Sequence, residues 1–192
     1  LARWGGAELF LPGGVVTGRP RLDGHFYGLC KLGASMSGER TYRFRTAGRL
    51  RGRELFLDEA SVTATEQILI AAATASGVTT LYNAACEPHV RDLALLLNAM
   101  GAKISGAGSN TIEIEGVEKL HGADYTVVGD HIEAGSFLAL AAASGGELTV
   151  HGTSPRHYWM LRRVFERLGI TMELRTDSIF LPGDQTRRIE CD

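Results

Sequence analysis

Two arginines lie in a loop whose composition suits the binding of a phosphate group. The stretch Leu11-Pro12-Gly13-Gly14 ends a predicted strand, and Arg19 and Arg21 follow it. A guanidinium group offers a planar pair of donors to a phosphate. Ser61 precedes a predicted helix, and the backbone N–H groups at a helix N-terminus favour anions. The simpler alternatives are loop cations in water and a Ser61 or Thr63 that only caps the helix.

Positive charge is concentrated in the first part of the chain. Residues 1–53 hold ten Lys or Arg against three acidic residues, whereas the remainder carries a net charge of −9. Five arginines alternate in a predicted hairpin: Arg43, Arg45, Arg49, Arg51 and Arg53. They fit either a strand edge in water or an anionic partner, and the few interleaved aromatic side chains disfavour nucleic acid. The six histidines and three cysteines lack metal-ligand spacing, so we expect no metal and no disulfide framework.

The elements that must position these residues repeat along the chain. Leu32-Gly33-Ala34, Met100-Gly101-Ala102 and Leu168-Gly169-Ile170 each end an amphipathic stretch, and their glycines lie 68 residues apart both times. Ile70 to Gly77 also matches Leu140 to Gly146 in its run of alanines. Spacing of this kind indicates that one supersecondary unit has been copied.

One complete unit is predicted between Glu54 and Glu115, with the order strand, helix, strand, helix, strand, strand. Apolar periodicity, a capping-box spacing and a first-turn proline support it. The predicted elements are Glu54–Asp58, a helix opened by Thr63 and Glu66, Val78–Tyr82, a helix from Pro88 to Met100, Ala102–Ser105 and Thr111–Glu115.

Two further copies flank this unit, and only the earlier one is incomplete. The later copy has predicted elements at Asp124–Val128, a helix opened by Asp130 and Glu133, Glu147–His151, a helix over Pro155–Leu168 that buries Tyr158, Leu161, Phe165 and Leu168, and strands around Thr171 and Ile179. Before Glu54 only the end of a unit is present: a strand at Glu8–Leu11, a helix and a hairpin. We therefore expect an α/β (α+β) fold of βαβαββ repeats that looks cut from a longer chain. Its uncovered apolar faces would allow self-association.

The chain resembles the enolpyruvyl transferase family, and within it the enzymes that act on UDP-N-acetylglucosamine. The resemblance extends from the start of the chain to about Phe137. It is carried by Leu11-Pro12-Gly13-Gly14, Asp23, His25, Gly28-Leu29, Leu32-Gly33-Ala34, Gly48-Arg49-Leu50, Ala64-Thr65, Asn83-Ala84-Ala85, Glu87-Pro88, Gly101 to Gly106, Ile112, Gly116-Val117-Glu118, Asp130 and Ile132-Glu133.

The resemblance implies a fold, a reaction and a place in the cell. Family members have two inside-out α/β barrels of three units each, so residues 1–129 would be the later half of one barrel and residues 130–192 the truncated first unit of the other. The reaction transfers the enolpyruvyl group of phosphoenolpyruvate to the 3′-hydroxyl of UDP-N-acetylglucosamine, for peptidoglycan precursors. No cofactor, nucleic acid or membrane is implied, and the compartment is the cytoplasm.

The resemblance also implies which residues bind the nucleotide sugar. They form two stretches: Arg19, Pro20, Arg21, Leu22 and Asp23, and then Glu59, Ala60, Ser61 and Val62. Val15 stands where the family usually has a cysteine or an aspartate, and valine cannot donate a proton. We therefore identify no catalytic residue in the chain and expect no turnover from it alone. Two alternatives stay open: a shikimate-3-phosphate enolpyruvyl transferase and a catalytically silent nucleotide-sugar-binding homologue.

Overall fold

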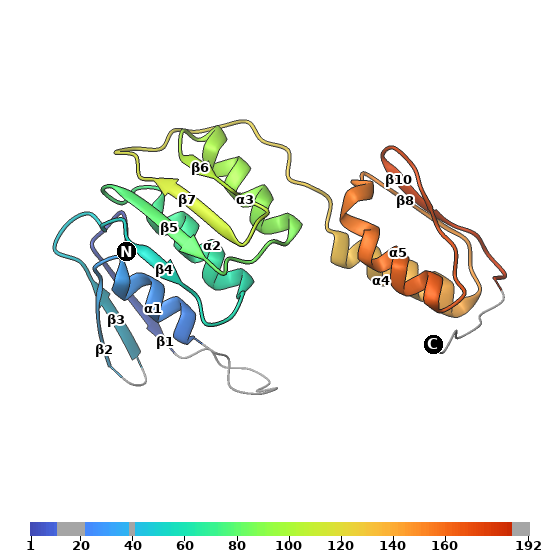
Figure 1. Cartoon of the computed structure of the whole chain (residues 1–192), viewed down its shortest axis with the longest axis horizontal. Helices are drawn as coiled ribbons and strands as arrows, with labels where there is room; N and C mark the ends of the chain where they lie inside the picture. The colour runs from blue at the N-terminus through green and yellow to red at the C-terminus, as the bar shows by residue number, and fades with distance from the viewer. Residues whose placement is uncertain (11–21, 39–40, 186–192) are drawn as a thin grey trace. The chain divides into compact units, whose positions relative to one another are not determined.

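The chain forms two compact units, Leu1–Tyr125 and Thr126–Asp192. The computed structural model describes residues 1–10, 22–38 and 41–185 (Figure 1). The larger unit contains β1 (Gly6–Phe10), α1 (Asp23–Lys31), β2 (Ser35–Ser37), β3 (Thr41–Arg45), β4 (Glu54–Phe56), α2 (Val62–Ala72), β5 (Val78–Tyr82), α3 (Pro88–Ala99), β6 (Lys103–Ser105) and β7 (Thr111–Glu115). The smaller unit contains α4 (His131–Ser144), β8 (Leu148–His151), a 3-10 turn at Pro155–Tyr158, α5 (Trp159–Arg167), β9 (Glu173–Leu174) and β10 (Ser178–Leu181). The mixed α/β class predicted from the sequence is confirmed.

Each of the three sheets repeats one topology. Their strand orders are β1-β3-β2, β5-β7-β6 and β8-β10-β9, and all of these pairs are antiparallel. In each copy a strand, a helix and a two-stranded hairpin follow one another, and the last strand lies in the middle of the three. The second copy has an additional strand, β4, which pairs in parallel with β5.

The second helix of each copy ends in the same turn, and these turns recur at the predicted period of 68 residues. Gly33, Gly101 and Gly169 have φ angles of 105°, 95° and 72°, which favour glycine over any residue with a Cβ atom. Each glycine N–H donates to the carbonyl three residues before it, and the next N–H donates to the carbonyl four residues before that glycine. This is the Schellman pattern at a helix C-terminus, so the repeat is a repeat of backbone geometry.

Two predicted helix starts have different outcomes. Asp130 caps α4, because its Oδ1 accepts from the N–H groups of Ile132 at 2.8 Å and Glu133 at 3.1 Å, as its position predicted. The capping box assigned to Thr63 is wrong. Ser61 is the N-cap of α2: its backbone is extended and its hydroxyl accepts from Ala64 N.

The predicted strand Asp124–Val128 does not form. The Tyr125 hydroxyl instead donates to Asp92 of α3, with its oxygen 2.7 Å from Oδ1 and 3.2 Å from the carbonyl oxygen. This contact binds Tyr125, the last residue of the larger unit, to α3. Burial raises the pKa of Tyr125, and the hydrogen bond with Asp92 raises it further.

The helices α1 and α2 lie side by side and run parallel. A Cβ atom at Gly28 would lie 2.6 Å from Cγ1 of Ile68, and one at Gly24 would lie 3.3 Å from Cβ of Ala64. The two contacts have the same sequence offset, so both N-termini lie at the same end of the pair (Figure 1). Leu29 and Leu32 extend this contact into the main core of the larger unit.

The smaller unit has its own core and a large apolar surface. Tyr158 and Phe165 are buried as predicted and Leu161 is half-buried, but Leu168 is 39% exposed, contrary to the prediction. Leu168 is the residue at which α5 turns out of the helix. Large apolar side chains on the surface include Ile132, Phe137, Leu140, Trp159, Met160 and Val164. Within the described ranges, no helix is long and apolar enough to cross a membrane.

The first prediction concerns the contact between α1 and α2. Gly28→Val should lower the free energy of unfolding by about 1–3 kcal/mol, because the added carbons overpack against Ile68. Urea unfolding followed by circular dichroism measures this. Gly48→Val is the matched control, since a Cβ atom there meets nothing within 4 Å, and it should change the stability by about 0.5 kcal/mol or less. An unchanged midpoint for Gly28→Val would contradict the close approach.

Candidate functional site

The parallel helices bring the two predicted binding stretches to one end of the pair. Leu22 and Asp23 lie at the N-terminus of α1, and Ser61 and Val62 lie at the N-terminus of α2. His25 connects the first turns, because its Nε2 lies 3.0 Å from Oγ1 of Thr63. Residues 38 positions apart in the sequence are thus in direct contact.

Part of the predicted site lies outside the described residues. Val15, Arg19, Pro20 and Arg21 belong to this part, so their roles stay predictions. The described members of the first stretch are a half-buried Leu22 and an exposed Asp23. The second stretch is described in full: Glu59 and Ala60 are exposed, and Ser61 and Val62 are half-buried.

Hydrogen bonds to the loop between β5 and α3 hold the Glu59–Val62 stretch at both ends. Before the stretch, Asn83 donates through Nδ2 to the carbonyl of Leu57 at 2.8 Å. After it, the Thr65 hydroxyl donates to the carbonyl of Ser61 at 2.7 Å and accepts from Ala85 N at 3.1 Å. Asn83 has a φ of 55°, a left-handed conformation that asparagine tolerates better than most residues. The stretch is therefore fixed before any ligand arrives.

Thr65 lies in a stretch that carries the family resemblance, but sequence reasoning assigned it no role in this site. It is fully buried within an otherwise apolar helix face. The available signal was a hydroxyl at a position where periodicity expects a carbon side chain. Such a buried hydroxyl needs partners, and its two partners are the backbone groups that it joins.

The electrostatics of this end suit a phosphorylated ligand. The backbone dipoles of α1 and α2 point their positive ends in the same direction, and a helix N-terminus leaves its first N–H groups without carbonyl partners inside the helix. Asp23 and Glu59 add exposed carboxylates, which accept hydrogen bonds from hydroxyl or amide groups. Donors for an anion and acceptors for a sugar are thus present together.

The arginine-rich segment lies at the opposite end of the same helices. A cavity of about 610 Å³ is lined by Leu32, Gly33, Thr46, Ala47, Gly48, Arg49, Arg51, Arg53 and Ser76. Leu32 and Gly33 follow the C-terminus of α1 and Ser76 follows that of α2, and cations near such termini balance the negative ends of the dipoles. The predicted hairpin forms from β2 and β3 and contains Arg43 and Arg45, but β3 ends at Arg45, so the other three arginines lie beyond it.

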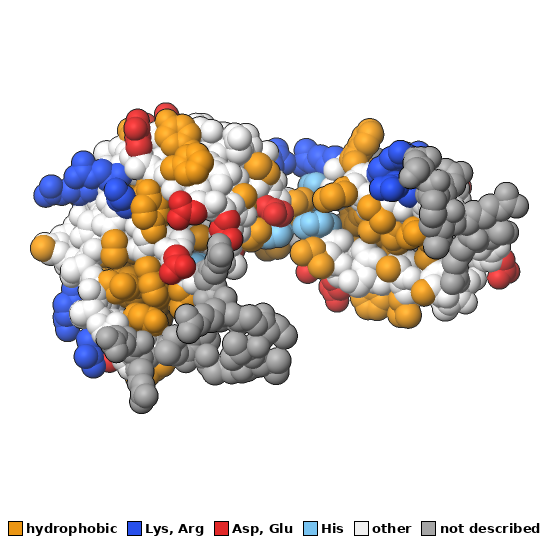
Figure 2. Space-filling view, turned by 60° about the horizontal axis from the view of Figure 1, so that its bottom comes forward, with side chains coloured by type: hydrophobic (Ala, Val, Ile, Leu, Met, Phe, Trp, Pro, Cys, Tyr) orange, Lys and Arg blue, Asp and Glu red, His pale blue; other side chains and the backbone are white. Residues whose placement is uncertain are grey.

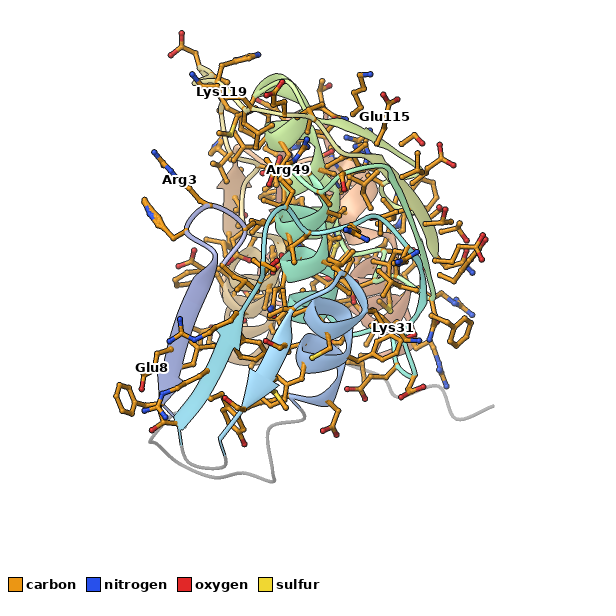
Figure 3. All side chains as sticks on the ribbon, turned by 90° about the vertical axis from the view of Figure 1, so that its left-hand side faces the viewer. Arg3, Glu8, Lys31, Arg49, Glu115 and Lys119 are labelled. Atoms are coloured by element: carbon orange, nitrogen blue, oxygen red, sulfur yellow. The ribbon has the colours of Figure 1, made fainter. Side chains whose placement is uncertain are left out.

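Arg49 has a structural role in this region. Its Nε donates to the carbonyl of Thr74 at 3.1 Å, and its Nη2 donates to those of Ala75 at 3.1 Å and Val117 at 2.7 Å. Figure 3 shows Arg49 at the end of α2 where this turn lies. The guanidinium thus joins the turn after α2 to the segment after β7, which favours packing over the binding of an anionic partner.

The side chains that could bind a metal ion or form a disulfide were also considered from the sequence. In residues 1–10, 22–38 and 41–185, no group of three or more His, Cys, Asp or Glu side chains is arranged to hold a metal ion. Cys30 and Cys86 are exposed free thiols.

Comparison with protein families decides the assignment. Residues 1–191 match the family model described as EPSP synthase (3-phosphoshikimate 1-carboxyvinyltransferase). The chain belongs to this family. The chain spans less than half of the length of each relative and solved structure described below.

Similar curated proteins share one name within the EPSP synthase family. The UDP-N-acetylglucosamine 1-carboxyvinyltransferase of Borreliella burgdorferi is 47% identical over 192 residues, which are 100% of this chain and 45% of that protein. The proteins of the same name from Bacteroides thetaiotaomicron and Treponema pallidum are 48% and 46% identical, over 99% and 100% of this chain and 44% and 45% of their own lengths.

Solved structures in the EPSP synthase family share the fold. The enolpyruvyl transferase NikO from Streptomyces tendae superposes with a TM-score of 0.79 at 22% identity, covering 97% of this chain and 46% of NikO. EPSP synthase from Acinetobacter baumannii gives a TM-score of 0.64 at 23% identity, covering 92% and 43%. The predicted fold class, incomplete repeats of an enolpyruvyl transferase, is therefore confirmed.

The second prediction tests the role of Thr65. Thr65→Val should lower the free energy of unfolding by about 1–3 kcal/mol, because it leaves the N–H of the buried Ala85 without its partner, whereas the Ser61 carbonyl keeps its bond from the Thr65 backbone N–H. Chemical denaturation of the chain measures the loss.

Thr79→Val is the matched control for this substitution. Thr79 is also fully buried, but its Oγ1 has no hydrogen-bond partner among the described residues. The same change there should be neutral or stabilising. Equal losses in the two variants would contradict the role assigned to Thr65.

Proposed function

We propose that this chain is part of an enzyme that transfers the enolpyruvyl group of phosphoenolpyruvate to the 3′-hydroxyl of UDP-N-acetylglucosamine. The observation that carries the proposal is the 45–48% identity, over the whole chain, to proteins named UDP-N-acetylglucosamine 1-carboxyvinyltransferase. Within that enzyme, the residues at the N-termini of α1 and α2 bind the nucleotide sugar. Backbone N–H groups near Ser61 face the diphosphate, and Asp23 accepts from the sugar or the base.

Two successive domains contribute to the proposed enzyme. We assign residues 1–129 to the later half of one barrel and residues 130–192 to the first unit of the next. Both substrates are metabolites made inside bacterial cells, so the proposed compartment is the cytoplasm. Neither nucleic acid nor a membrane takes part in the proposed reaction.

Val15 determines how active the proposed enzyme is. The methylene carbon of phosphoenolpyruvate must gain a proton while the sugar hydroxyl attacks the neighbouring carbon. A positioned general acid contributes about 100- to 10,000-fold to such a step. Valine supplies no proton, and this observation favours a second candidate, a nucleotide-sugar-binding homologue without turnover.

The third prediction separates these functions in a chimera. Residues 1–192 replace the aligned segment of the Borreliella burgdorferi relative, with either Val15 or Val15→Cys. We expect phosphate release from phosphoenolpyruvate with UDP-N-acetylglucosamine as acceptor, at least about 100-fold faster with Val15→Cys. Shikimate 3-phosphate should support no release, and the isolated chain should not turn over either acceptor.

Several outcomes of this assay would contradict the proposal. Preference for shikimate 3-phosphate would assign the chain to the other acceptor class. Saturable binding of UDP-N-acetylglucosamine by calorimetry, without turnover even with Val15→Cys, would support the silent homologue. A folded chimera that neither binds nor turns over UDP-N-acetylglucosamine would overturn the proposal.

The fourth prediction concerns self-association of the isolated chain. Figure 2 shows apolar side chains on the surface of the smaller unit, and residues such as Leu140, Trp159 and Met160 are 63–80% exposed. Exposed apolar faces of this kind associate in water. We propose that a second copy covers them, and sedimentation velocity should show a concentration-dependent dimer. Trp159→Gln combined with Met160→Gln should shift the chain to monomer, whereas Lys103→Gln in the larger unit should not.

A further inference from the structure

His25 lies between the two helices whose N-termini form the proposed nucleotide-sugar site. Its Nδ1 is hydrogen-bonded to Oε1 of Gln67, and its Nε2 is hydrogen-bonded to Oγ1 of Thr63 at 3.0 Å. Both partners are on α2, one helical turn apart, whereas His25 is in the first turn of α1. Both ring nitrogens therefore bond to the neighbouring helix.

The contact between His25 and Thr63 lies beside the proposed binding residues on both helices. His25 follows Asp23 by two residues, and Thr63 directly follows Val62. A change in the distance between the His25 ring and Thr63 would change the separation of the two binding stretches. Gly24 brings no side chain to its close approach to Ala64, whereas the neighbouring His25 ring bonds across to α2 and so fixes the rotation of the two first turns.

We propose that His25 is a positioning residue for the nucleotide sugar. Its ring holds the first turns of α1 and α2 in register, so that the stretches ending at Asp23 and Val62 meet one ligand together. It touches neither the ligand nor the reacting atoms, so its substitution weakens nucleotide-sugar binding and leaves the chemical step unchanged. This role rests on the proposed function.

The fifth prediction measures this role in the Val15→Cys chimera. Thr63→Val should raise the KM for UDP-N-acetylglucosamine about 3- to 10-fold, the effect of losing one net hydrogen bond, and His25→Ala, which also loses the bond to Gln67, should raise it at least as much. The kcat and the KM for phosphoenolpyruvate should stay within about twofold, because transition-state interactions are untouched. The double variant should be no worse than His25→Ala alone, since Thr63→Val removes a contact that His25→Ala has already removed.

Two control variants separate positioning from general stability. His25→Gln keeps a side-chain amide within reach of Thr63 and should recover most of the affinity. Ile114→Val removes one methyl group from a fully buried residue of β7. It should destabilise the protein by an amount similar to His25→Ala, as urea unfolding will check, and leave the KM for the nucleotide sugar unchanged.

The outcomes distinguish this inference from the proposed function. If the unsubstituted chimera does not saturate with UDP-N-acetylglucosamine, the proposed function fails, and the role of His25 fails with it. If that chimera saturates but His25→Ala and Thr63→Val leave its KM unchanged, only the positioning role is overturned. Additive effects of the two substitutions, or a raised KM in Ile114→Val, would also overturn it.

Discussion

The close parallel packing of α1 on α2 is the contact on which the rest of the larger unit depends. It is available because Gly28 brings no side chain to Ile68, so the two backbones approach more closely than any other residue would allow. Leu29 and Leu32 then fill the space beneath the helices together with the strands. A single missing Cβ atom thus determines both the core and the separation of the two N-termini.

This packing gives the helix pair two ends of opposite polarity. At the C-terminal end, three arginines line a cavity, and one of them, Arg49, holds three carbonyl groups. At the N-terminal end, the first N–H groups of each helix lie beside Asp23 and Ser61. Arg49, part of what looks like one basic segment in the sequence, is therefore used in packing at the C-terminal end of the helix pair.

The sequence was sufficient for most of the fold because its strongest signals are local. Pro88 and Gly101 bound α3 and its following turn, and β5 and β7 have the predicted residues, since periodicity and backbone preference act over a few positions. It failed at Asp124–Val128, where a contact with a residue more than thirty positions away replaced strand pairing.

For the candidate site, the sequence indicated the two binding stretches only through resemblance. The contacts that hold these stretches could not be predicted from the sequence, because His25, Thr65 and Asn83 each bond to groups 20 or more positions away. No periodic pattern encodes such pairings, because they depend on how the helices and loops meet in three dimensions. Residues that position a site are therefore harder to find from sequence than the residues that end its helices.

The missing counterpart of β4 has a consequence for the smaller unit. In the described part of the chain, β8 is the outermost strand of its sheet, whereas its equivalent β5 has β4 beside it. The outer edge of β8 therefore presents backbone donors and acceptors in the spacing that a parallel neighbour requires. The chain itself approaches this edge, because a Cβ atom at Gly129 would lie 2.5 Å from the carbonyl oxygen of Gly152, directly after β8, so Gly129 is confined to glycine by the strand beside it.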